Sequence, residues 1–419
     1  MGAITSSNEN GSVEDPSMKK IHTHYVFLIH GWLGNSSEMS YLESAINRAA
    51  NDFPSSTAST QTNVNSRIVT HCAKVNNWRT TDGIASGGTR LAHEIQQFIL
   101  DDIQKNNHDN DNTSTSNESS DSGSGEHHVS ISFVGNSLGG LYARYALSQL
   151  PMQLNVQETK ITIHRMLFVT TATPHLGVAG RGHTFLPIPR LAEQVIGRAL
   201  QTTGKDLFRI DNDDLIYKMS TDIEFLQPLS LFQKRVAYIN AFRTDFQVPT
   251  RTAAFLSKNS TYPHYIHENE EDLPFLVAIA STKANHDILR GVEDEDELPC
   301  KKHTMSVKLD ALGWEKVFVD MRDYIPRGIK LPSFLRKCSR EKWKDFMKSK
   351  ESNGEQSNIV ESRELDAFMT GSDRIHIPVG HDVMVANARS ESYSSFTVKG
   401  RPVMDYLASG VVKDLDLFV

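Results

Sequence analysis

The sequence predicts an α/β fold in which a mostly parallel sheet is covered by helices on both faces. Two observations carry this prediction. Runs of apolar and β-branched residues alternate along the chain with segments whose apolar residues recur at helical spacing. The chain also has 419 residues, of which 38% are hydrophobic, and this is enough for one large domain or two ordinary ones.

Six short runs have the composition of buried strands, being apolar and rich in β-branched or aromatic residues. They are Tyr25–Ile29, Arg67–Ala73, Val129–Val134, Ile161–Thr170, Arg235–Phe242 and Lys316–Met321. A helix is expected over residues 88–100, because Leu91, Ile95 and Ile99 recur at helical spacing.

Residues 183–234 form a long mixed segment between two of these strands. Its helical stretches are Leu191–Leu200, Leu215–Met219 and Ile223–Phe232. The segment has the position of a helical cap or lid, although its apolar residues suit ordinary packing helices equally well. The sequence leaves this choice open.

Other segments stand out by composition. Residues 1–20 are polar and are expected to be a disordered tail. Residues 106–126 are almost wholly Asn, Ser, Asp, Gly and Thr, which predicts a flexible insertion. Residues 258–310 and 340–372 are expected to be loop-rich. We therefore expect a single domain over residues 21–419.

Charge and cysteine content exclude several classes of protein. The net charge is −7, with acidic and basic residues interspersed, so no basic stripe indicates a nucleic-acid partner. Cys72, Cys300 and Cys338 are far apart and odd in number, which argues against a disulfide framework or a zinc site and favours a reducing compartment. No run reaches the roughly 18 apolar residues of a membrane span. The amino terminus lacks the apolar core of a signal peptide, so a cytoplasmic location is expected.

The first residues, Met1-Gly2-Ala3-Ile4-Thr5-Ser6, fit the pattern for myristoylation at Gly2. One acyl chain binds a membrane only marginally, and no nearby cysteine or basic cluster offers a second attachment. Two interpretations stay open: a lipid-modified tail with peripheral contact to a membrane, or a plain tail that begins with a small residue.

Ser137 is the most specific feature of the chain. It lies in Gly135-Asn136-Ser137-Leu138-Gly139-Gly140, directly after the expected strand Val129–Val134. A strand that ends in G-x-S-x-G and turns at once into a helix is the nucleophile elbow of an α/β-hydrolase. The turn is too sharp for side chains at Gly135 and Gly139. The helix expected over Leu141–Leu150 directs its positive amino end at the serine.

A second part of such a site lies upstream, where five apolar residues end in His30-Gly31. In hydrolases of this fold, a loop like this one supplies one backbone N–H of the oxyanion hole, and the residue after the nucleophile supplies the other. The expected donors are the N–H groups of Trp32, with Leu33 as an alternative, and of Leu138. Each such donor lowers the barrier by about 3 kcal/mol, because it stabilises the charge that develops on an ester carbonyl.

A serine hydroxyl also needs a base, and the base needs an acid that holds its tautomer. In this fold the acid follows the serine, and the histidine follows the acid. Asp245 lies in a turn just after the expected strand Arg235–Phe242. The alternatives Asp211, Asp213 and Asp222 fall in the segment of the cap, where acids more often cap helices or stay solvated.

Two histidines near the carboxyl end compete for the role of base. Gly380 and Asp382 around His381 mark a loop that opens into an apolar run, whereas His376 lies between isoleucines in an expected strand. His381 is therefore the favoured base. His175 precedes the acid, which is the wrong chain order, so a structural or pocket-lining role is expected for it.

Several segments in order resemble one family, the eukaryotic putative serine esterases, a lipase-like α/β-hydrolase domain first named as a domain of unknown function. The resemblance covers roughly residues 22–257, and the chain departs from the family in its Asn/Ser-rich insertion and in the stretch near 260–370. The matching segments are Gly88–Ile95, Gly135–Tyr145, Thr173–Gly177, Thr203–Phe208 and Val236–Pro249.

The resemblance implies hydrolysis of a carboxylic ester, with lipid esters of the acylglycerol type as the expected substrates. The family's acid stands at an Asp-x-x-Val-Pro position, which Asp245 matches, and its histidine precedes an apolar pair, as His381 does. No metal or organic cofactor is required. Three alternatives stay open: acyl transfer to another alcohol, a thioesterase acting on acylated substrates, and a non-catalytic interaction module with this fold.

Overall fold

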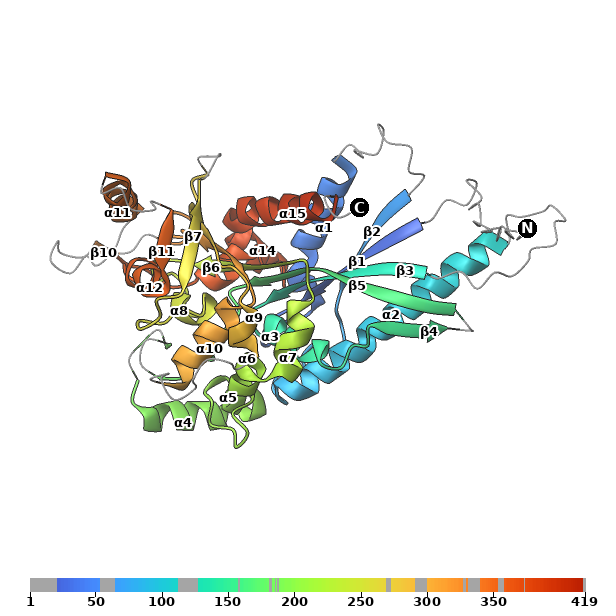
Figure 1. Cartoon of the computed structure of the whole chain (residues 1–419), viewed down its shortest axis with the longest axis horizontal. Helices are drawn as coiled ribbons and strands as arrows, with labels where there is room; N and C mark the ends of the chain where they lie inside the picture. The colour runs from blue at the N-terminus through green and yellow to red at the C-terminus, as the bar shows by residue number, and fades with distance from the viewer. Residues whose placement is uncertain are drawn as a thin grey trace, which may run out of the picture.

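One mixed sheet runs through the molecule and separates two layers of helices (Figure 1). In this computed structural model, ten strands of the described residues form the sheet in the order β11-β7-β8-β9-β6-β5-β3-β1-β2, with β4 beside β5. The structure describes all residues except 1–20, 53–64, 112–126, 157–158, 181–182, 185, 187, 269–272, 291–299, 327–328, 331–339, 353–357, 373 and 417–419.

The central strands are parallel, and each of the six expected strands is present among them. They are β1 (Ile21–Ile29), β2 (Asn65–Cys72), β3 (His127–Asn136), β5 (Thr159–Thr171), β6 (Lys234–Asn240) and β9 (Glu315–Val319). The remaining strands of the sheet are antiparallel to their neighbours, namely β4 (Gln153–Val156), β7 (Pro263–His267), β8 (Leu276–Ser281) and β11 (Ile359–Glu361). A separate antiparallel pair joins β10 (Ile329–Lys330) to β12 (Arg374–Ile375).

Helices cover both faces of the sheet. One layer includes α1 (Ser40–Asp52) and α15 (Arg401–Asp416), and the opposite layer includes α2 (Ile84–Asp111) and α3 (Leu138–Leu147) (Figure 1). The other helices are η1 (Ser36–Met39), α8 (Thr250–Ala253), α9 (His286–Leu289), α10 (Lys301–Asp310), α11 (Arg340–Ser352), α12 (Ser362–Met369), α13 (Gly380–Met384), α14 (Glu391–Thr397) and η5 (Val398–Gly400).

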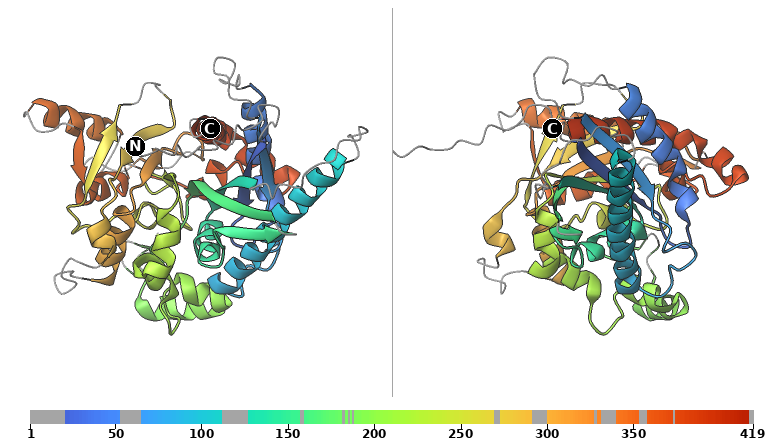
Figure 2. Two further views of the ribbon diagram at one scale, coloured as in Figure 1. Left: turned by 45° about the vertical axis from the view of Figure 1, so that its right-hand side comes forward. Right: turned by 90° about the vertical axis from the view of Figure 1, so that its right-hand side faces the viewer.

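The segment expected as a cap consists of four helices between β5 and β6. They are α4 (Arg190–Ala199), α5 (Gln201–Leu207), α6 (Leu215–Thr221) and α7 (Ile223–Ser230). Figure 2 shows α4 and α5 in light green at one end of the molecule in both views. Ile216 of α6 and Leu226 of α7 are buried, so these two helices pack against the body.

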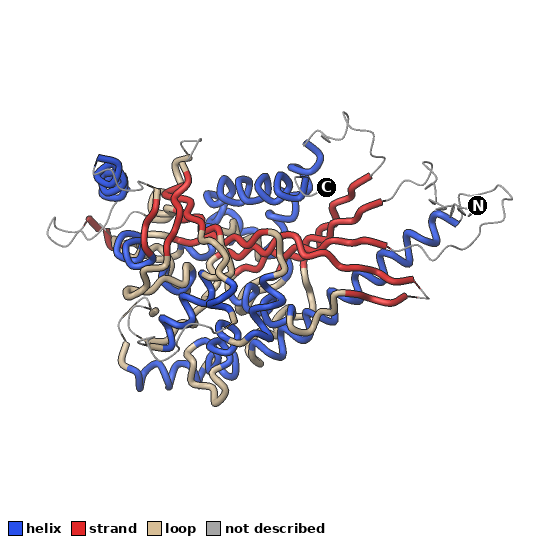
Figure 3. Tube along the Cα trace, viewed as in Figure 1, coloured by secondary structure: helices blue, strands red, loops and turns tan. Residues whose placement is uncertain are grey.

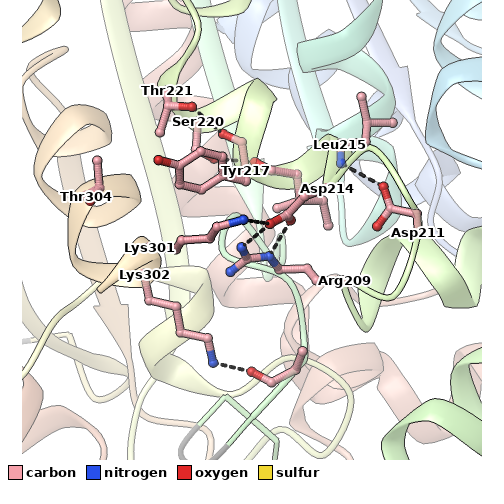
Figure 4. A network of polar contacts seen from close by, with 12 residues as sticks. Arg209, Asp211, Asp214, Leu215, Tyr217, Ser220, Thr221, Lys301, Lys302 and Thr304 are labelled. Atoms are coloured by element: carbon pink, nitrogen blue, oxygen red, sulfur yellow. Dashed lines mark hydrogen bonds and ion pairs between the residues drawn. The ribbon is translucent and has the colours of Figure 1, made fainter. Parts of the chain in front are cut away.

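A polar network joins α6 to the body (Figure 4). Arg209 donates two hydrogen bonds of 2.7 Å to Asp214, and Lys301 of α10 donates a third, of 3.1 Å. From α3, the buried Arg144 donates to the carbonyl oxygen of Met219 at 2.5 Å. Burial lowers the pKa of Arg144 to about 9. These contacts fix α6 between α3 and α10.

The core follows the central strands, which Figure 3 shows as one layer between helices. Tyr25–Ile29 of β1 are all at most 1% exposed, as expected for a parallel strand covered on both faces. Phe27 of this strand stacks on Phe133 of β3 with ring centroids 5.8 Å apart, and Phe133 contacts Phe168 of β5 with ring centroids 6.2 Å apart. Burying each such ring contributes roughly 1.5–3 kcal/mol.

The prediction of loop-rich stretches at 258–310 and 340–372 is wrong. The first contains β7, β8, α9 and α10, and the second contains α11, β11 and α12. The run Leu276-Val-Ala-Ile-Ala280 is short and apolar, which is a sequence signal for a buried strand. In the structure it is mostly buried. The helix α2 also extends through Asp111, into the segment expected as an insertion. The rest of that insertion, and the tail with Gly2, lie outside the described residues.

The strand order places a site at one edge of the sheet. From β1 the chain crosses to β2 on one side, and from β3 it crosses to β5 on the other. The order therefore reverses between β1 and β3. Ligands of open α/β sheets bind at such a reversal, beyond the carboxyl ends of the strands. Here Ile29 pairs with Gly135, so both strands end level with each other, directly before Ser137.

Glycines allow α3 to lie directly on the ends of these strands. A Cβ atom at Gly135 would stand 2.5 Å from the Cα atom of Gly140, and one at Gly139 would overlap the carbonyl oxygen of Ile29. Since these neighbours are backbone, they cannot rotate away.

We predict that Gly135→Ala lowers the free energy of unfolding by about 3 kcal/mol, because the methyl group forces α3 off the sheet. The matched control is Gly410→Ala in α15, whose Cβ would come no closer than 3.9 Å to the hydroxyl of Tyr238. This control should raise stability by about 0.5–1 kcal/mol through helix propensity. Urea unfolding measures both, and equal stabilities of the two variants would contradict the prediction.

Candidate functional site

Ser137 sits on strained backbone between β3 and α3. Its φ of 54° and ψ of −122° lie in a region that side chains rarely adopt, and such a residue typically stores about 1–3 kcal/mol of strain. Its N–H donates to the carbonyl oxygen of Thr171 at 2.8 Å, which fixes the turn. The side chain makes no capping hydrogen bond to α3. Its hydroxyl is therefore not used to cap the helix.

The loop after β1 lies against this serine. A Cβ atom at Gly31 would stand 3.0 Å from the Cβ of Ser137, so the loop backbone passes directly beside the nucleophile candidate. The carbonyl oxygen of Gly31 accepts hydrogen bonds from the N–H of Gly34 at 3.2 Å and from Nδ1 of His30 at 3.0 Å. Because a carbonyl only accepts, Nδ1 of His30 carries the proton. Burial lowers the pKa of His30, which keeps the ring neutral.

The two candidate donors on this loop differ in availability. The N–H of Leu33 donates to Oγ1 of Thr80 at 2.8 Å and is thereby used within the protein. The N–H of Trp32 has no acceptor in the hydrogen bonds recorded among the described residues. Leu138 is the first residue of α3, where an N–H has no partner within the helix. Trp32 and Leu138 therefore remain the pair that suits an oxyanion.

Asp245 and His381 are in direct contact, although 136 residues separate them along the chain. Nδ1 of His381 donates to Oδ2 of Asp245 at 2.8 Å. Asn240 donates to the same oxygen at 2.9 Å, and the N–H groups of Gln247 and Val248 donate to Oδ1 at 2.9 and 2.8 Å. Both residues are buried, at 1% and 3% exposure. In the neutral ring Nδ1 carries the proton, so Nε2 is the nitrogen left for accepting one.

Backbone hydrogen bonds hold the two loops together. The N–H of Gly380 donates to the carbonyl oxygen of Thr244 at 2.8 Å, and the N–H of Phe246 donates to that of Pro378 at 3.0 Å. A Cβ at Gly380 would stand 2.7 Å from the Thr244 oxygen. Glycine at 380 is therefore needed for the approach that brings His381 to Asp245.

The environment of His381 acts on its pKa in two directions. Burial lowers the pKa of the imidazole, but the charge and the hydrogen bond of Asp245 raise it by more, and the pKa lies at about 9. The charges of Asp382 and Glu38 act in the same direction as that of Asp245. The pair thus stabilises an imidazolium, which is the state a general base reaches after accepting a proton.

The alternative acids have other roles. Asp211 accepts from the N–H of Leu215 at 2.8 Å, at the start of α6. Asp213 is exposed and lies 3.6 Å from Lys218. Asp222 occupies the N-cap position of α7. Asp211 thus binds the start of a helix and Asp213 is solvated, as the sequence indicated, whereas the side chain of Asp222 makes no capping hydrogen bond.

The alternative histidines, His376 and His175, are buried, as His381 is. His376 directly follows β12. His175 is fully buried, contacts the ring of Trp314, and has Nδ1 3.3 Å from Arg144. Burial, followed by the charges of Arg144 and Lys316, holds the pKa of His175 well below its usual value. A neutral, enclosed ring of this kind suits a structural role.

Sequence reasoning missed Glu38 on η1. Its Oε2 accepts the N–H of Gly31 at 2.8 Å, in the loop that carries Trp32. A carboxylate nine residues after a strand gives no local signal, because its role depends on partners near the other end of the chain.

Comparison with known proteins gives a family match. A family model described as Putative serine esterase (DUF676) matches residues 19–259, which is more than half of the chain. The match includes Ser137, Asp245 and the loop after β1, and it ends before His381.

Curated relatives are named as putative lipases. ROG1 of Saccharomyces cerevisiae is 28% identical over 285 residues, which are 66% of this chain and 35% of the relative. C4A8.10 of Schizosaccharomyces pombe is 34% identical over 131 residues, 30% of this chain and 16% of the relative. YDL109C of Saccharomyces cerevisiae is 27% identical over 239 residues, 56% and 30% of the two chains. The chain thus spans about a third or less of these relatives.

Two solved structures show only weak likeness. Phospholipase PlaB from Legionella pneumophila, in complex with thio-NAD, has a TM-score of 0.26 and 11% identity, covering 51% of this chain and 38% of that one. A putative cell surface hydrolase from Lactobacillus plantarum has a TM-score of 0.25 and 11% identity, covering 57% and 76%. At such scores neither structure bears on this chain. None of the helices in the described part of the chain is long and apolar enough to cross a bilayer.

The raised pKa of His381 predicts how stability changes with pH. Below about pH 6.5 the imidazole is charged in both folded and unfolded states, so its pairing with Asp245 contributes fully. As the pH rises towards the folded pKa of about 9, the unfolded state loses its proton first. The free energy of unfolding should then fall by up to about 1.4 kcal/mol per pH unit in this window.

Urea unfolding of the native chain and of His381→Gln, at several pH values, measures this contribution. The stability advantage of the native chain should be largest near the low end of the window and should shrink towards its high end. An advantage that is the same at every pH would contradict the prediction.

Proposed function

This chain belongs to the putative serine esterase family, and on that premise we propose that it hydrolyses carboxylic esters of lipids through Ser137, His381 and Asp245. The observation that carries the proposal is the buried hydrogen bond of 2.8 Å between Nδ1 of His381 and Asp245. It joins the two candidates that follow the elbow in the chain order of this fold.

In the proposed acylation step, Oγ of Ser137 attacks the ester carbonyl while Nε2 of His381 accepts the hydroxyl proton. The carbonyl π electrons move onto oxygen and give a tetrahedral oxyanion. When the carbonyl re-forms, the bond to the alcohol breaks, and the alcohol leaves with the proton from Nε2. The acyl group is then esterified to Ser137.

In the proposed deacylation step, water takes the place of the alcohol. Nε2 of His381 accepts a proton from water as its oxygen attacks the acyl carbonyl, and it returns the proton to Oγ of Ser137 as the acid leaves. Asp245 keeps the proton on Nδ1 throughout and stabilises the imidazolium. The balance is one ester and one water consumed, one acid and one alcohol released.

The N–H groups of Trp32 and Leu138 are the proposed oxyanion donors. Hydrogen bonds within the loop fix the Gly31 carbonyl before substrate binds, so the donor on the next residue needs no reorganisation. Removing one such donor costs about 3 kcal/mol of barrier in other hydrolases. The positive amino end of α3 adds to this stabilisation.

Lipid esters of the acylglycerol type are the proposed substrates, since the curated relatives are named as putative lipases. On α4, Leu191 and Val195 are 75% and 66% exposed and lie one helical turn apart, on one face. Such an apolar face suits contact with the surface of a lipid aggregate. The location we propose is accordingly cytoplasmic with peripheral contact to a membrane.

We predict that Ser137→Ala lowers ester turnover by at least about 10⁴-fold and abolishes labelling by a fluorophosphonate, because no other group supplies the attacking oxygen. Ser148→Ala, at the C-terminal end of the same helix, is the matched control and should label at the native rate. Gel fluorescence and mass mapping of the label measure both. Continued labelling of Ser137→Ala at the native rate would refute the assignment.

A substrate panel tests the proposed lipid class. Acylglycerols, phospholipids, short-chain esters and palmitoyl thioesters are compared with and without a bilayer surface, and added acceptor alcohols separate hydrolysis from acyl transfer. We expect acylglycerols to be cleaved fastest of the panel. We also expect their cleavage to be about tenfold or more faster with a bilayer surface than without one. Faster cleavage of soluble short-chain esters or of thioesters would contradict the lipid-ester assignment.

A further inference from the structure

A buried carboxylate, Glu38, lies between two loops of the proposed site. It belongs to η1 and is 2% exposed. Oε2 accepts the N–H of Gly31 at 2.8 Å. Oε1 accepts Nδ2 of Asn387 at 2.6 Å and Nη2 of Arg389 at 2.9 Å. One side chain therefore binds both the loop after β1 and the segment after α13, and 349 positions separate Glu38 from Asn387 in the chain.

On the first side, Glu38 acts on the loop that carries the proposed oxyanion donor. The bond to the Gly31 N–H fixes one peptide plane, and the bonds from Gly34 and His30 to the Gly31 carbonyl fix the next. A trans peptide is planar, with its C=O and N–H opposed. Holding the Gly31 carbonyl therefore sets the direction of the Trp32 N–H.

On the second side, Glu38 acts on the segment that carries the proposed base. Asn387 donates its N–H to the carbonyl oxygen of Asp382 at 3.2 Å, and its Nδ2 also lies 3.2 Å from Oδ1 of Asp382. Asp382 directly follows His381 in α13. Asn387 thus helps to fix the helical turn that carries His381.

We propose that Glu38 is a positioning residue that fixes the oxyanion loop and the base loop relative to each other, so that Trp32 and His381 act on the same Ser137 intermediate. This inference rests on the proposed function. A carboxylate suits the position because it offers only acceptors to three donors. A glutamine would direct its own N–H groups at donors in either orientation, either at the Gly31 N–H or at Asn387 and Arg389.

Other charged groups surround this contact. Arg389 neutralises Glu38 from the solvent side and is 30% exposed at its side chain. Asp382 of α13 and Tyr393 of α14 lie on either side of Arg389 in the chain. Burial and the hydrogen bond to Asp382 raise the pKa of Tyr393. Asp245 approaches His381 from the turn after β6. A test must therefore separate positioning of the loops from a change in charge near the imidazole.

Two substitutions make this separation. Glu38→Gln removes a negative charge near His381, and Arg389→Met removes a positive one, so a purely electrostatic role would shift the pH profile in opposite directions. A positioning role predicts that both variants react more slowly with a fluorophosphonate at high pH. There the reaction rate no longer changes with pH (the plateau rate), because the imidazole is neutral in every variant. We expect a loss of about 10- to 100-fold for Glu38→Gln and a smaller loss for Arg389→Met.

The matched control is Glu364→Gln on α12. Its carboxylate accepts one backbone N–H at 2.8 Å and one lysine at 3.3 Å, but it belongs to neither loop. The control should keep the native plateau rate. Hydrogen exchange of the peptides spanning residues 28–34 and 380–389 supplies a readout that needs no turnover. Exchange should accelerate in both peptides in Glu38→Gln, and in neither peptide in the control.

Each outcome decides one question. Native plateau rates in both variants, or unchanged exchange in Glu38→Gln, would overturn the positioning role while leaving the proposed function intact. Absence of Ser137-dependent labelling in the native chain would overturn the proposed function, and hydrogen exchange alone would then decide whether Glu38 couples the loops. If Glu38→Gln does not fold, the milder Arg389→Met decides by the same two measurements.

Discussion

The helix α3 approaches the ends of β1 and β3 with no side chain between them, and this close contact organises the site. Glycines at 135 and 139 permit it, because a Cβ at either would meet backbone. The approach forces Ser137 into its strained conformation and places the amino end of the helix beside the Gly31 loop. A nucleophile candidate, two backbone donors and a helix dipole thus result from a single packing contact.

Buried polar contacts extend this local arrangement to the far end of the chain. Moving a carboxylate out of water is expensive unless its oxygens find donors. Asp245 accepts four hydrogen bonds and Glu38 accepts three. Each set includes at least one donor from residues 381–389, so this segment supplies hydrogen bonds to both carboxylates. Leaving either charge unpaired would destabilise the fold, which ties the geometry of the site to the stability of the domain.

Features that depend on local pattern were predictable from the sequence, and those that depend on distant partners were not. The parallel strands carry continuous apolar runs, and the elbow has a fixed motif, so both could be found. Asp245 and His381 followed from chain order and loop chemistry, and the structure brings their side chains together. The strand β11 at the edge of the sheet and its neighbour β7 are short and only partly buried, so their sequences resemble those of loops. Glu38 and Arg144 looked ordinary, since their partners lie far along the chain.

A crystal structure of the chain after reaction with a lipid-like fluorophosphonate would test the proposed catalytic site. We expect a covalent bond from phosphorus to Oγ of Ser137. We also expect the phosphoryl oxygen within hydrogen-bond distance of the N–H groups of Trp32 and Leu138, and Nε2 of His381 facing the phosphonate. Phosphorus bonded to another residue, or an imidazole turned away from Ser137 with its bond to Asp245 broken, would contradict this proposal.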